Sequence, residues 1–322
     1  MARTGVLLQG YGGPATVDDV DPFMLNLMGR VPSPELLARI QAQYRAIGGG
    51  SPLLGIAEKI AAKLAARLAA SGHQTEVRVG MRYWEPYIAD AVRALADSGF
   101  ERIVAVSLSA FESEIATGAY RKALGDVFAE HPYLEIVEAP LVGAHPSYAE
   151  IFASNVREAL TRVPAGAIVA CSAHSLPLSD VVEDDPYVAG IRGVAASVAE
   201  KLGLAPGAGE AGKRLGDGFS AFGSDQGPNP WYLAYQSKGA RPGGWLGPEL
   251  DALLAGAART SAPGVVVCPI GFMTDHMETV WDLDHLATKR AAELGVPFTR
   301  AAVPNDDDRL VAALAESALA LM

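Results

Sequence analysis

The sequence predicts an α/β protein made of two doubly wound, Rossmann-like units, each built on a parallel β-sheet. Short β-branched runs alternate with longer segments of helical period, which is the pattern of a parallel sheet with helices on both faces. The strand runs are almost continuously apolar, as expected for strands that are buried on both sides. The 322 residues correspond to two such units at about 150 residues each.

The first half of the chain carries four expected strands and three expected helices. The strands are residues 5–9, 76–80, 102–108 and 134–139. The helices are residues 34–47, 56–70 and 87–96. The segment GAHPS (143–147) then interrupts the pattern, so we expect an N-terminal domain over residues 1–143.

The second half repeats the alternation. Its expected strands are residues 167–172, 231–236 and 265–269. Its expected helices are residues 147–161, 188–202, 248–255, 284–293 and 307–321. We expect a C-terminal domain over residues 144–306, and a final helix, 307–322, that packs back on the N-terminal domain. The Gly- and Pro-rich stretch 205–230 has little periodicity and predicts a long surface loop.

Composition excludes several classes of function. The formal net charge of -11 argues against nucleic acid as the main partner, since no basic tract offsets it. The two cysteines, Cys171 and Cys268, lie in apolar runs, which is typical of reduced core thiols in a cytosolic protein. The N-terminus lacks the apolar core of a signal peptide, and no stretch approaches the ~20 apolar residues of a membrane span. We therefore expect a cytoplasmic protein.

Polar segments that directly follow apolar strands are the first places to look for a site in a parallel sheet, because ligands gather at the carboxyl ends of strands. One is YGGP (11–14), whose glycines either admit an anion to the backbone or form a tight strand-to-helix turn. Another is QSKG (236–239) with WLGP (245–248), which either walls a flat ligand or forms a packed turn.

A histidine emerges where the strand 167–172 ends, in the segment SAHSLP (172–177). Because an imidazole has an ordinary pKa of about 6.5, His174 can serve as a base or as a metal ligand near neutral pH. The alternative is a histidine that caps the following helix.

An acidic segment follows the strand 265–269. If it is helical, Glu278 and Asp282 are four residues apart and share one face, with His285 on nearly the same side. Carboxylates without a basic neighbour suit a hydrated divalent cation or a proton relay when they are buried. A solvated acidic face is the alternative.

Two motifs that are absent from the sequence argue against two classes of enzyme. No G-x-S-x-G elbow and no H-E-x-x-H motif occurs, which argues against a serine hydrolase and a zincin protease. A strand-end histidine together with a Glu/Asp/His cluster fits proton removal combined with the handling of a divalent metal.

Six motifs together resemble the ferrochelatase family, in the family's order and along essentially the whole chain. They are YGGP (11–14), GGGSPL (48–53), WEP (84–86), SAHSLP (172–177), QSKGARPGGWLGPE (236–249) and PIGFMTDHMETVWDLD (269–284). The resemblance implies a chelatase-type fold whose two domains clasp a tetrapyrrole. It also implies a lyase-class enzyme of heme biosynthesis that inserts Fe²⁺ into a porphyrin and releases two protons.

The resemblance also implies roles for particular residues. His174 matches the family's proton acceptor and iron ligand, and Glu278 matches its catalytic partner. Asp282 continues the acidic line for metal or protons, and His276 supports the site. The porphyrin-binding positions matched are Tyr11, Ser51 and Tyr120, and the Tyr11 motif favours the branch that uses coproporphyrin III.

Several positions depart from that branch. Gln43 stands where an arginine is expected, so Arg30 and Arg45 are the nearby cations that could receive propionates. Glu112 and Glu114 would repel propionates if they face the pocket.

Leu286 takes the place of a third carboxylate, and the two cysteines cannot supply four thiolates. We therefore expect Fe²⁺ as substrate, no permanently bound cofactor and no iron–sulfur cluster. The expected partners are the porphyrin and, transiently, neighbouring enzymes of the heme pathway.

The alternatives left open are protoporphyrin IX, favoured by the apolar stretch 23–28, and another metal or tetrapyrrole. A non-catalytic tetrapyrrole carrier on the same scaffold is the third.

Overall fold

The computed structural model describes residues 3–206, 230–239 and 241–322, so most of the loop predicted at 205–230 lies outside the described residues. The chain divides into two compact units. Unit 1 comprises Met1–His145, Met273–Met277 and Asn305–Met322, and unit 2 comprises Pro146–Phe272 and Glu278–Pro304.

The core of unit 1 is a four-stranded parallel sheet in the order β2-β1-β3-β4. Its strands are β1 (Thr4–Gly10), β2 (Val77–Met81), β3 (Arg102–Ser107) and β4 (Glu135–Glu138). The strands β1 and β3 are buried almost throughout, which explains their unbroken apolar sequences. The chain passes from β2 on one side of β1 to β3 on the other, so the carboxyl ends of β1 and β3 form the topological switch point.

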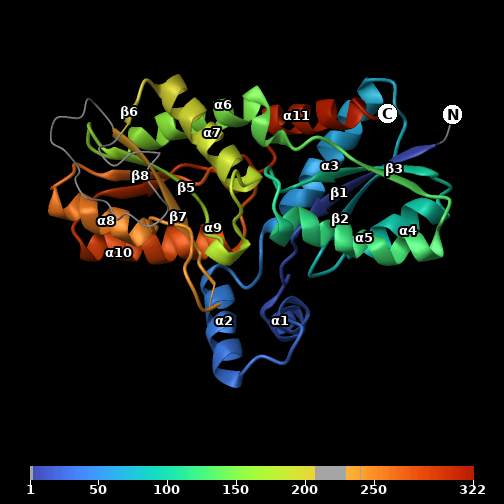
Figure 1. Cartoon of the computed structure of the whole chain (residues 1–322), viewed down its shortest axis with the longest axis horizontal. Helices are drawn as coiled ribbons and strands as arrows, with labels where there is room; N and C mark the ends of the chain where they lie inside the picture. The colour runs from blue at the N-terminus through green and yellow to red at the C-terminus, as the bar shows by residue number, and fades with distance from the viewer. Residues whose placement is uncertain (1–2, 207–229, 240) are drawn as a thin grey trace. The chain divides into compact units, whose positions relative to one another are not determined.

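Helices cover both faces of this sheet, as Figure 1 shows: α3 and α11 lie on one side, and α4 and α5 on the other. Their bounds are α3 (Leu53–Ala70), α4 (Ile88–Asp97), α5 (Ala119–Glu130) and α11 (Asp308–Leu319). The C-terminal helix α11 packs on α3 within unit 1.

Two further helices, α1 (Val20–Met28) and α2 (Pro34–Ala46), form a small layer of their own in unit 1. They pack through a cluster centred on Val20, Phe23, Met24 and Tyr44. Helix α2 begins at Pro34, directly after the capping residue Ser33. The Ser33 hydroxyl accepts a hydrogen bond from Leu36 N at 3.2 Å.

Unit 2 is built on a five-stranded parallel sheet in the order β6-β7-β5-β8-β9. Its strands are β5 (Ile168–His174), β6 (Ala205–Pro206), β7 (Pro230–Gln236), β8 (Val265–Cys268) and β9 (Phe298–Arg300). The central β5 has β7 on one side and β8 on the other, which puts its carboxyl end at the switch point of this sheet. Cys171 of β5 and Cys268 of β8 are paired in register, buried and free, as the sequence predicts.

In unit 2 the helices α6 (Pro146–Leu160) and α7 (Pro186–Leu202) lie on one side of the sheet, with α8 (Leu250–Arg259) and α10 (Thr288–Glu293) on the other (Figure 1). The Asp185 carboxylate caps α7 by accepting from Tyr187 N and Val188 N. The two parallel sheets with flanking helices confirm the predicted fold class.

In the described part of the chain, two segments adopt π-helical geometry, with i→i+5 hydrogen bonds. The segment η2 (Glu114–Gly118) leads into α5, and η5 (Val280–Ala287) follows the short helix α9 (Met277–Thr279). The sequence predicts an ordinary helix over 284–293, whereas its first turn belongs to η5. The remaining short elements are 3₁₀ turns, η1 (Val17–Asp19), η3 (Val142–Ala144) and η4 (Leu178–Asp180).

Candidate active site

His174 is the last residue of β5, so the buried central strand of unit 2 presents its imidazole at the carboxyl edge of the sheet. Its main-chain carbonyl accepts a hydrogen bond of 2.9 Å from the buried Tyr187 hydroxyl. Its Nδ1 lies 2.5 Å from the carbonyl oxygen of Ser175. A carbonyl can only accept, so Nδ1 carries the proton and Nε2 is the nitrogen directed toward the rest of the site.

Glu278 faces that nitrogen. The Oε1 atom of Glu278 lies 3.3 Å from His174 Nε2, and both side chains are about one-third exposed. Burial by itself would lower the pKa of His174, but the Glu278 carboxylate, the Ser175 carbonyl and Asp282 together raise it to about 9. The pair therefore holds a proton at neutral pH, as an imidazolium beside a carboxylate.

Asp282 lies on η5, four residues after Glu278, and its carboxylate accepts a hydrogen bond from the Ser237 hydroxyl. Burial raises the pKa of Asp282 to about 6, while the Ser237 hydroxyl opposes that shift. His285, which the sequence puts near the same face, stacks on Trp281 with ring centroids 5.3 Å apart. The structure thus groups His174, Glu278 and Asp282 within unit 2.

Sequence reasoning missed the hydrogen-bonding role of Gln236 and Ser237, which it treats only as part of a loop that walls a ligand. Both residues end or follow β7 and lie beside β5, because Gln236 is the register partner of His174. A polar Gln-Ser pair directly after an apolar strand is the signal that could have pointed to them.

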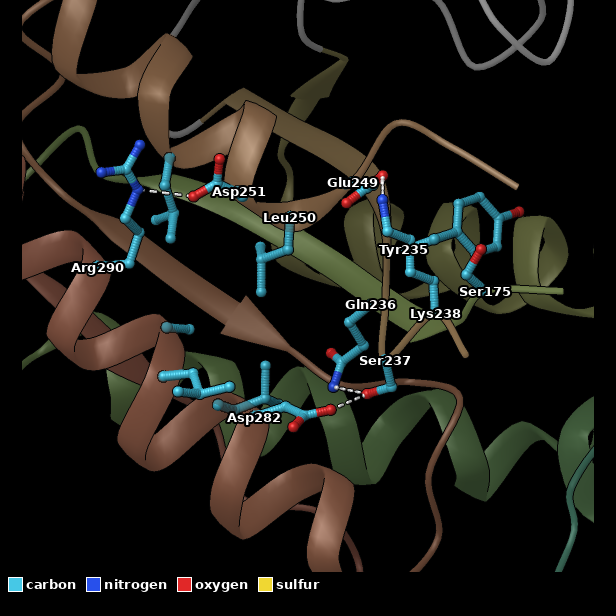
Figure 2. Close-up of a pocket in the computed structure, with 14 residues that line it drawn as sticks. Ser175, Tyr235, Gln236, Ser237, Lys238, Glu249, Leu250, Asp251, Asp282 and Arg290 are labelled. Carbon is cyan, nitrogen blue, oxygen red and sulfur yellow. Dashed lines mark hydrogen bonds and ion pairs between the residues drawn. The ribbon is translucent and has the colours of Figure 1, made fainter. Parts of the chain in front are cut away.

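A cavity of about 330 Å³ opens beside Asp282 in unit 2 (Figure 2). Asp282, Gln236 and Ser237 lie along one part of its wall, and Leu250, Leu254 and Leu286 supply apolar surface. Two ion pairs lie in this lining: Lys238 with Glu249 at 2.6 Å, and Arg290 with Asp251 at 2.7 Å.

Tyr11 and Ser51 belong to unit 1, in two loops that interlock. The Ser51 amide donates to the Pro14 carbonyl at 2.8 Å, and a Cβ on Gly13 would lie 2.9 Å from the Ser51 side chain. Tyr11 packs against Tyr83, with ring centroids 4.7 Å apart. The close approach explains the glycine at position 13.

Tyr120 is buried in the core of unit 1, and its hydroxyl lies 3.1 Å from the Ser109 hydroxyl. Burial raises the pKa of this phenol to about 12. Ser109 follows β3 and Tyr11 follows β1, so both border the switch point of this sheet.

Arg30 and Arg45 are exposed side chains of unit 1, and Arg45 donates to the Gln41 amide at 3.4 Å. A cation that sequence reasoning missed is Arg82, whose guanidinium lies over the Tyr83 ring at 4.8 Å. Arg82 follows β2, and its buried Nε has no hydrogen-bond partner among the residues that the structure describes.

The acidic residues that the sequence marks as a threat to propionates are neutralised within unit 1. Glu112 accepts from Arg121 at 2.7 Å and from Thr117, and the Arg121 guanidinium holds the pKa of this carboxyl below its usual range. Glu114 pairs with Lys122 at 2.8 Å.

His276 lies in the segment Met273–Met277, which belongs to unit 1 although it directly precedes Glu278. Hydrogen bonds from Asn305 N to the Met273 carbonyl and from Asp275 N to the Asn305 amide hold this segment. The predicted supporting role of His276 stays a prediction.

The donors that a metal ion would find at the end of β5 are His174 Nε2 and the Glu278 carboxylate. Within the described ranges, no group of three or more His, Cys, Asp or Glu side chains is arranged to hold a metal ion. No helix in those same ranges combines the length and apolar character needed to span a membrane.

Comparison with known proteins decides the family. The family model described as Ferrochelatase matches residues 3–320. The chain belongs to the ferrochelatase family. This confirms the resemblance drawn from the motifs, and it identifies the protein as an enzyme, a metal chelatase.

One relative of this chain is the ferrochelatase of Herpetosiphon aurantiacus. The two sequences are 31% identical over 319 residues, which cover 96% of this chain and 96% of the relative. The coproporphyrin III ferrochelatase of Streptomyces griseus is 34% identical over 321 residues, which cover 96% of this chain and 83% of the relative. The coproporphyrin III ferrochelatase of Mycolicibacterium smegmatis is 31% identical over 317 residues, which cover 96% of this chain and 87% of the relative.

Solved structures of other chelatases share the fold. The sirohydrochlorin chelatase SirB of Bacillus subtilis in complex with cobalt has a TM-score of 0.56 and 10% identity, covering 98% of this chain and 94% of its own. CbiX, from siroheme biosynthesis in denitrifying bacteria, has a TM-score of 0.51 and 16% identity, with 99% of each chain covered. At these identities the likeness concerns the fold alone.

Proposed function

We propose that this ferrochelatase-family enzyme inserts Fe²⁺ into coproporphyrin III in heme biosynthesis. The observation that carries the proposal is the His174–Glu278 pair, with 3.3 Å between Nε2 and Oε1, at the carboxyl end of the central strand of unit 2. One imidazole nitrogen is oriented by a backbone carbonyl, which leaves the other for substrate.

The reaction requires that two N–H protons leave the porphyrin as the metal enters. A base must therefore accept protons beside the pyrrole nitrogens, and an anionic group must stabilise the incoming cation. In our proposal His174 Nε2 and the Glu278 carboxylate hold the metal before insertion. Once the metal has passed to the porphyrin, Nε2 accepts one pyrrole proton and the Glu278 carboxylate accepts the other. Asp282 continues the path for metal or protons, because burial brings its pKa to about 6, where a carboxyl exchanges protons near neutral pH.

His174 must lose its own proton before Nε2 can accept another. A divalent cation at the Glu278 carboxylate would remove the charge that raises the pKa of His174, so metal arrival favours deprotonation of the imidazole. The same residues can thereby couple metal binding to proton acceptance.

We further propose that Tyr11, Ser51 and Tyr120 of unit 1 bind the porphyrin, with Arg30 and Arg45 available to its propionates. The exposed ring of Tyr11 suits stacking on a flat macrocycle. The ion pairs of Glu112 with Arg121 and of Glu114 with Lys122 support binding of an anionic substrate, since they cancel local negative charge. Contacts with neighbouring enzymes of the heme pathway and a cytoplasmic location remain predictions.

Coproporphyrin III is favoured over protoporphyrin IX by the relatives named coproporphyrin III ferrochelatase, at 31% to 34% identity. The apolar stretch 23–28, which favours protoporphyrin IX at the level of sequence, is partly committed to the core of unit 1. Phe23 and Met24 are buried there, whereas Leu25 is 44% exposed.

The deciding experiment is an anaerobic assay of the purified full chain with Fe²⁺ and either porphyrin, followed by the Soret band. We expect metallation of coproporphyrin III with the higher kcat/KM. Because imidazole and carboxylate also suit Zn²⁺ and Co²⁺, both metals are assayed in parallel.

His174→Ala provides the matched test of the site. We expect it to bind porphyrin, measured by fluorescence quenching, without metallating it. Failure of the unmodified protein to metallate either porphyrin with any of these metals, while still binding porphyrin, would show a tetrapyrrole carrier instead.

A further inference from the structure

The carboxyl end of β7 lies between the two parts of unit 2 that carry the candidate catalytic groups. Gln236 is the register partner of His174, and its main-chain carbonyl accepts from the Ser175 amide at 2.8 Å. Its side-chain amide nitrogen donates to the main-chain carbonyl of Glu278 at 3.2 Å. One residue therefore links the backbone beside His174 to the backbone of Glu278.

The orientation of the Gln236 side chain is determined by its neighbours. A main-chain carbonyl can only accept, so the NH₂ group must face Glu278. The amide oxygen then accepts from the buried Ser172 hydroxyl at 2.8 Å. Gln236 is 7% exposed, so these hydrogen bonds are shielded from water and loss of either partner would leave a buried polar group unsatisfied.

Ser237 makes a similar contact with Asp282. Its hydroxyl donates to the Asp282 carboxylate on η5, as Figure 2 shows. Ser237 adopts a φ of 58°, in the left-handed region where residues other than glycine are strained. A serine that holds this conformation while bonding a half-buried carboxylate indicates a role for the hydroxyl rather than for the backbone.

The π-helical geometry of η5 gives these contacts their importance. Such segments are rare and are seldom longer than one turn, because their packing is less favourable than that of an α-helix. The eight-residue π-segment that carries Asp282 directly follows α9, the short helix of Glu278, and it needs contacts from outside itself to keep one geometry. Ser237 supplies one of them from the end of β7, through its bond to Asp282, and Gln236 bonds the Glu278 carbonyl in α9, which leads into η5.

We propose that Gln236 and Ser237 are positioning residues for the chelation reaction, Gln236 setting Glu278 against His174 and Ser237 setting the carboxylate of Asp282. This inference rests on the proposed function. Groups that orient metal ligands and their neighbours from one shell further out typically change metal affinity or activity by about 10- to 100-fold.

Ser237→Gly is the sharpest variant. It removes the hydroxyl and at the same time relieves the strained backbone, so a loss of activity cannot be attributed to a destabilised turn. We expect kcat/KM for Fe²⁺ to fall by about 10-fold or more, with the coproporphyrin III dissociation constant and the melting temperature unchanged. Ser237→Asn, which tolerates the left-handed region and carries an amide donor, is expected to recover part of the activity.

The control is Ser261→Gly. Ser261 is an exposed residue of the same unit with a φ of 54°, so the change to glycine has the same effect on the backbone far from Asp282 in the sequence. We expect its activity with Fe²⁺ to match the unmodified protein.

Gln236→Met tests the second residue, since it keeps the length of the side chain without its donors and acceptor. We expect a similar loss in kcat/KM for Fe²⁺ with coproporphyrin III binding retained. If the unmodified protein metallates porphyrin and both Ser237→Gly and Gln236→Met keep full kcat/KM for Fe²⁺, the positioning role is wrong while the proposed function stands. If the unmodified protein is itself inactive, the proposed function fails and the positioning role with it.

Discussion

The two nitrogens of His174 have different surroundings, and this difference governs its chemistry. Nδ1 faces the Ser175 carbonyl, which keeps it protonated, and Nε2 faces the Glu278 carboxylate at 3.3 Å. Burial opposes the charged imidazole, so its pKa of about 9 depends on the carboxylates of Glu278 and Asp282 and on that carbonyl. The protonation state at neutral pH is therefore set by these neighbours, with Glu278 making the largest contribution among those that raise the pKa.

Glu278→Gln removes the main charge that opposes the effect of burial, so the pKa of His174 is expected to fall well below 9. Histidine ¹⁵N chemical shifts followed over pH measure this directly, with Glu158→Gln on α6 as the control that leaves the pKa in place.

The same pair contributes to stability in a defined pH window. The folded-state pKa lies above the unfolded value of 6.5, so the contribution is complete below pH 6.5 and is lost as the pH rises through 9. Glu278→Gln should lack this part of the pH dependence. A His174 pKa that stays near 9 in Glu278→Gln would contradict the assignment of Glu278 as the controlling charge.

At the scale of elements, the loop after β1 is held against its neighbours by glycines that cannot be exchanged freely. Gly12 has a φ of 93°, and a Cβ there would lie 2.9 Å from the Trp84 amide nitrogen and 3.1 Å from the Met81 Cβ. The chain at Gly12 thus combines a left-handed backbone with close approach, and it positions Tyr11 beside Tyr83.

Gly12→Ala is expected to lower the free energy of unfolding by about 3 kcal/mol, because backbone strain and overpacking add. Gly29→Ala is the matched control: Gly29 has a φ of 64°, but an added methyl group would enter open space, so about 1 kcal/mol is expected there. Urea denaturation of both variants gives the comparison, and equal losses would argue against the close contact at Gly12.

At the scale of the whole molecule, the C-terminal segment of the chain belongs to the same compact unit as the N-terminal segment. Helix α11 packs on α3, and Lys63 of α3 pairs with Asp306 at 2.9 Å and with Asp308 at 3.1 Å. These ion pairs are partly exposed, so they contribute little to the free energy of unfolding. The packing of α11 in unit 1 is therefore stabilised mainly by its buried apolar face.

Leu314→Ala on that face is expected to cost about 2–5 kcal/mol, because Leu314 is 1% exposed and its removal leaves a cavity. Leu25→Ala, at a leucine that is 44% exposed, serves as the control and should change stability much less. Thermal unfolding of the two variants measures the difference. Equal stability would show that α11 is not part of the core of unit 1.

Several elements escaped prediction from sequence for identifiable reasons. Helix α5 contains Gly125 and follows a π-segment, although Tyr120, Leu124 and Val127 lie at helical spacing on its buried face. Helix α1 contains Pro22, a residue type that argues against a helix in a sequence pattern. In the structure Pro22 lies in the first turn, where proline is tolerated. Strand β9 is three half-buried residues long, too short for a periodic signal.

The sequence alone was sufficient for the α/β class, for most strands and helices, and for the motifs that identify the ferrochelatase family. These features depend on local periodicity and on residue types at fixed positions, which a linear pattern contains. It also marked His174, at the end of a predicted strand, and Glu278, which is four residues from Asp282 in the acidic segment after the next predicted strand.

Only the tertiary structure decided which atoms of those residues lie in contact. The approach of Glu278 to Nε2 and the contacts of Gln236 with Glu278 and of Ser237 with Asp282 join segments 40 or more residues apart. Likewise, Glu112 is a threat to an anionic substrate in the sequence and a partner of Arg121 in the structure. Charge and pKa depend on distance and burial, and both are set by packing between elements rather than by order along the chain.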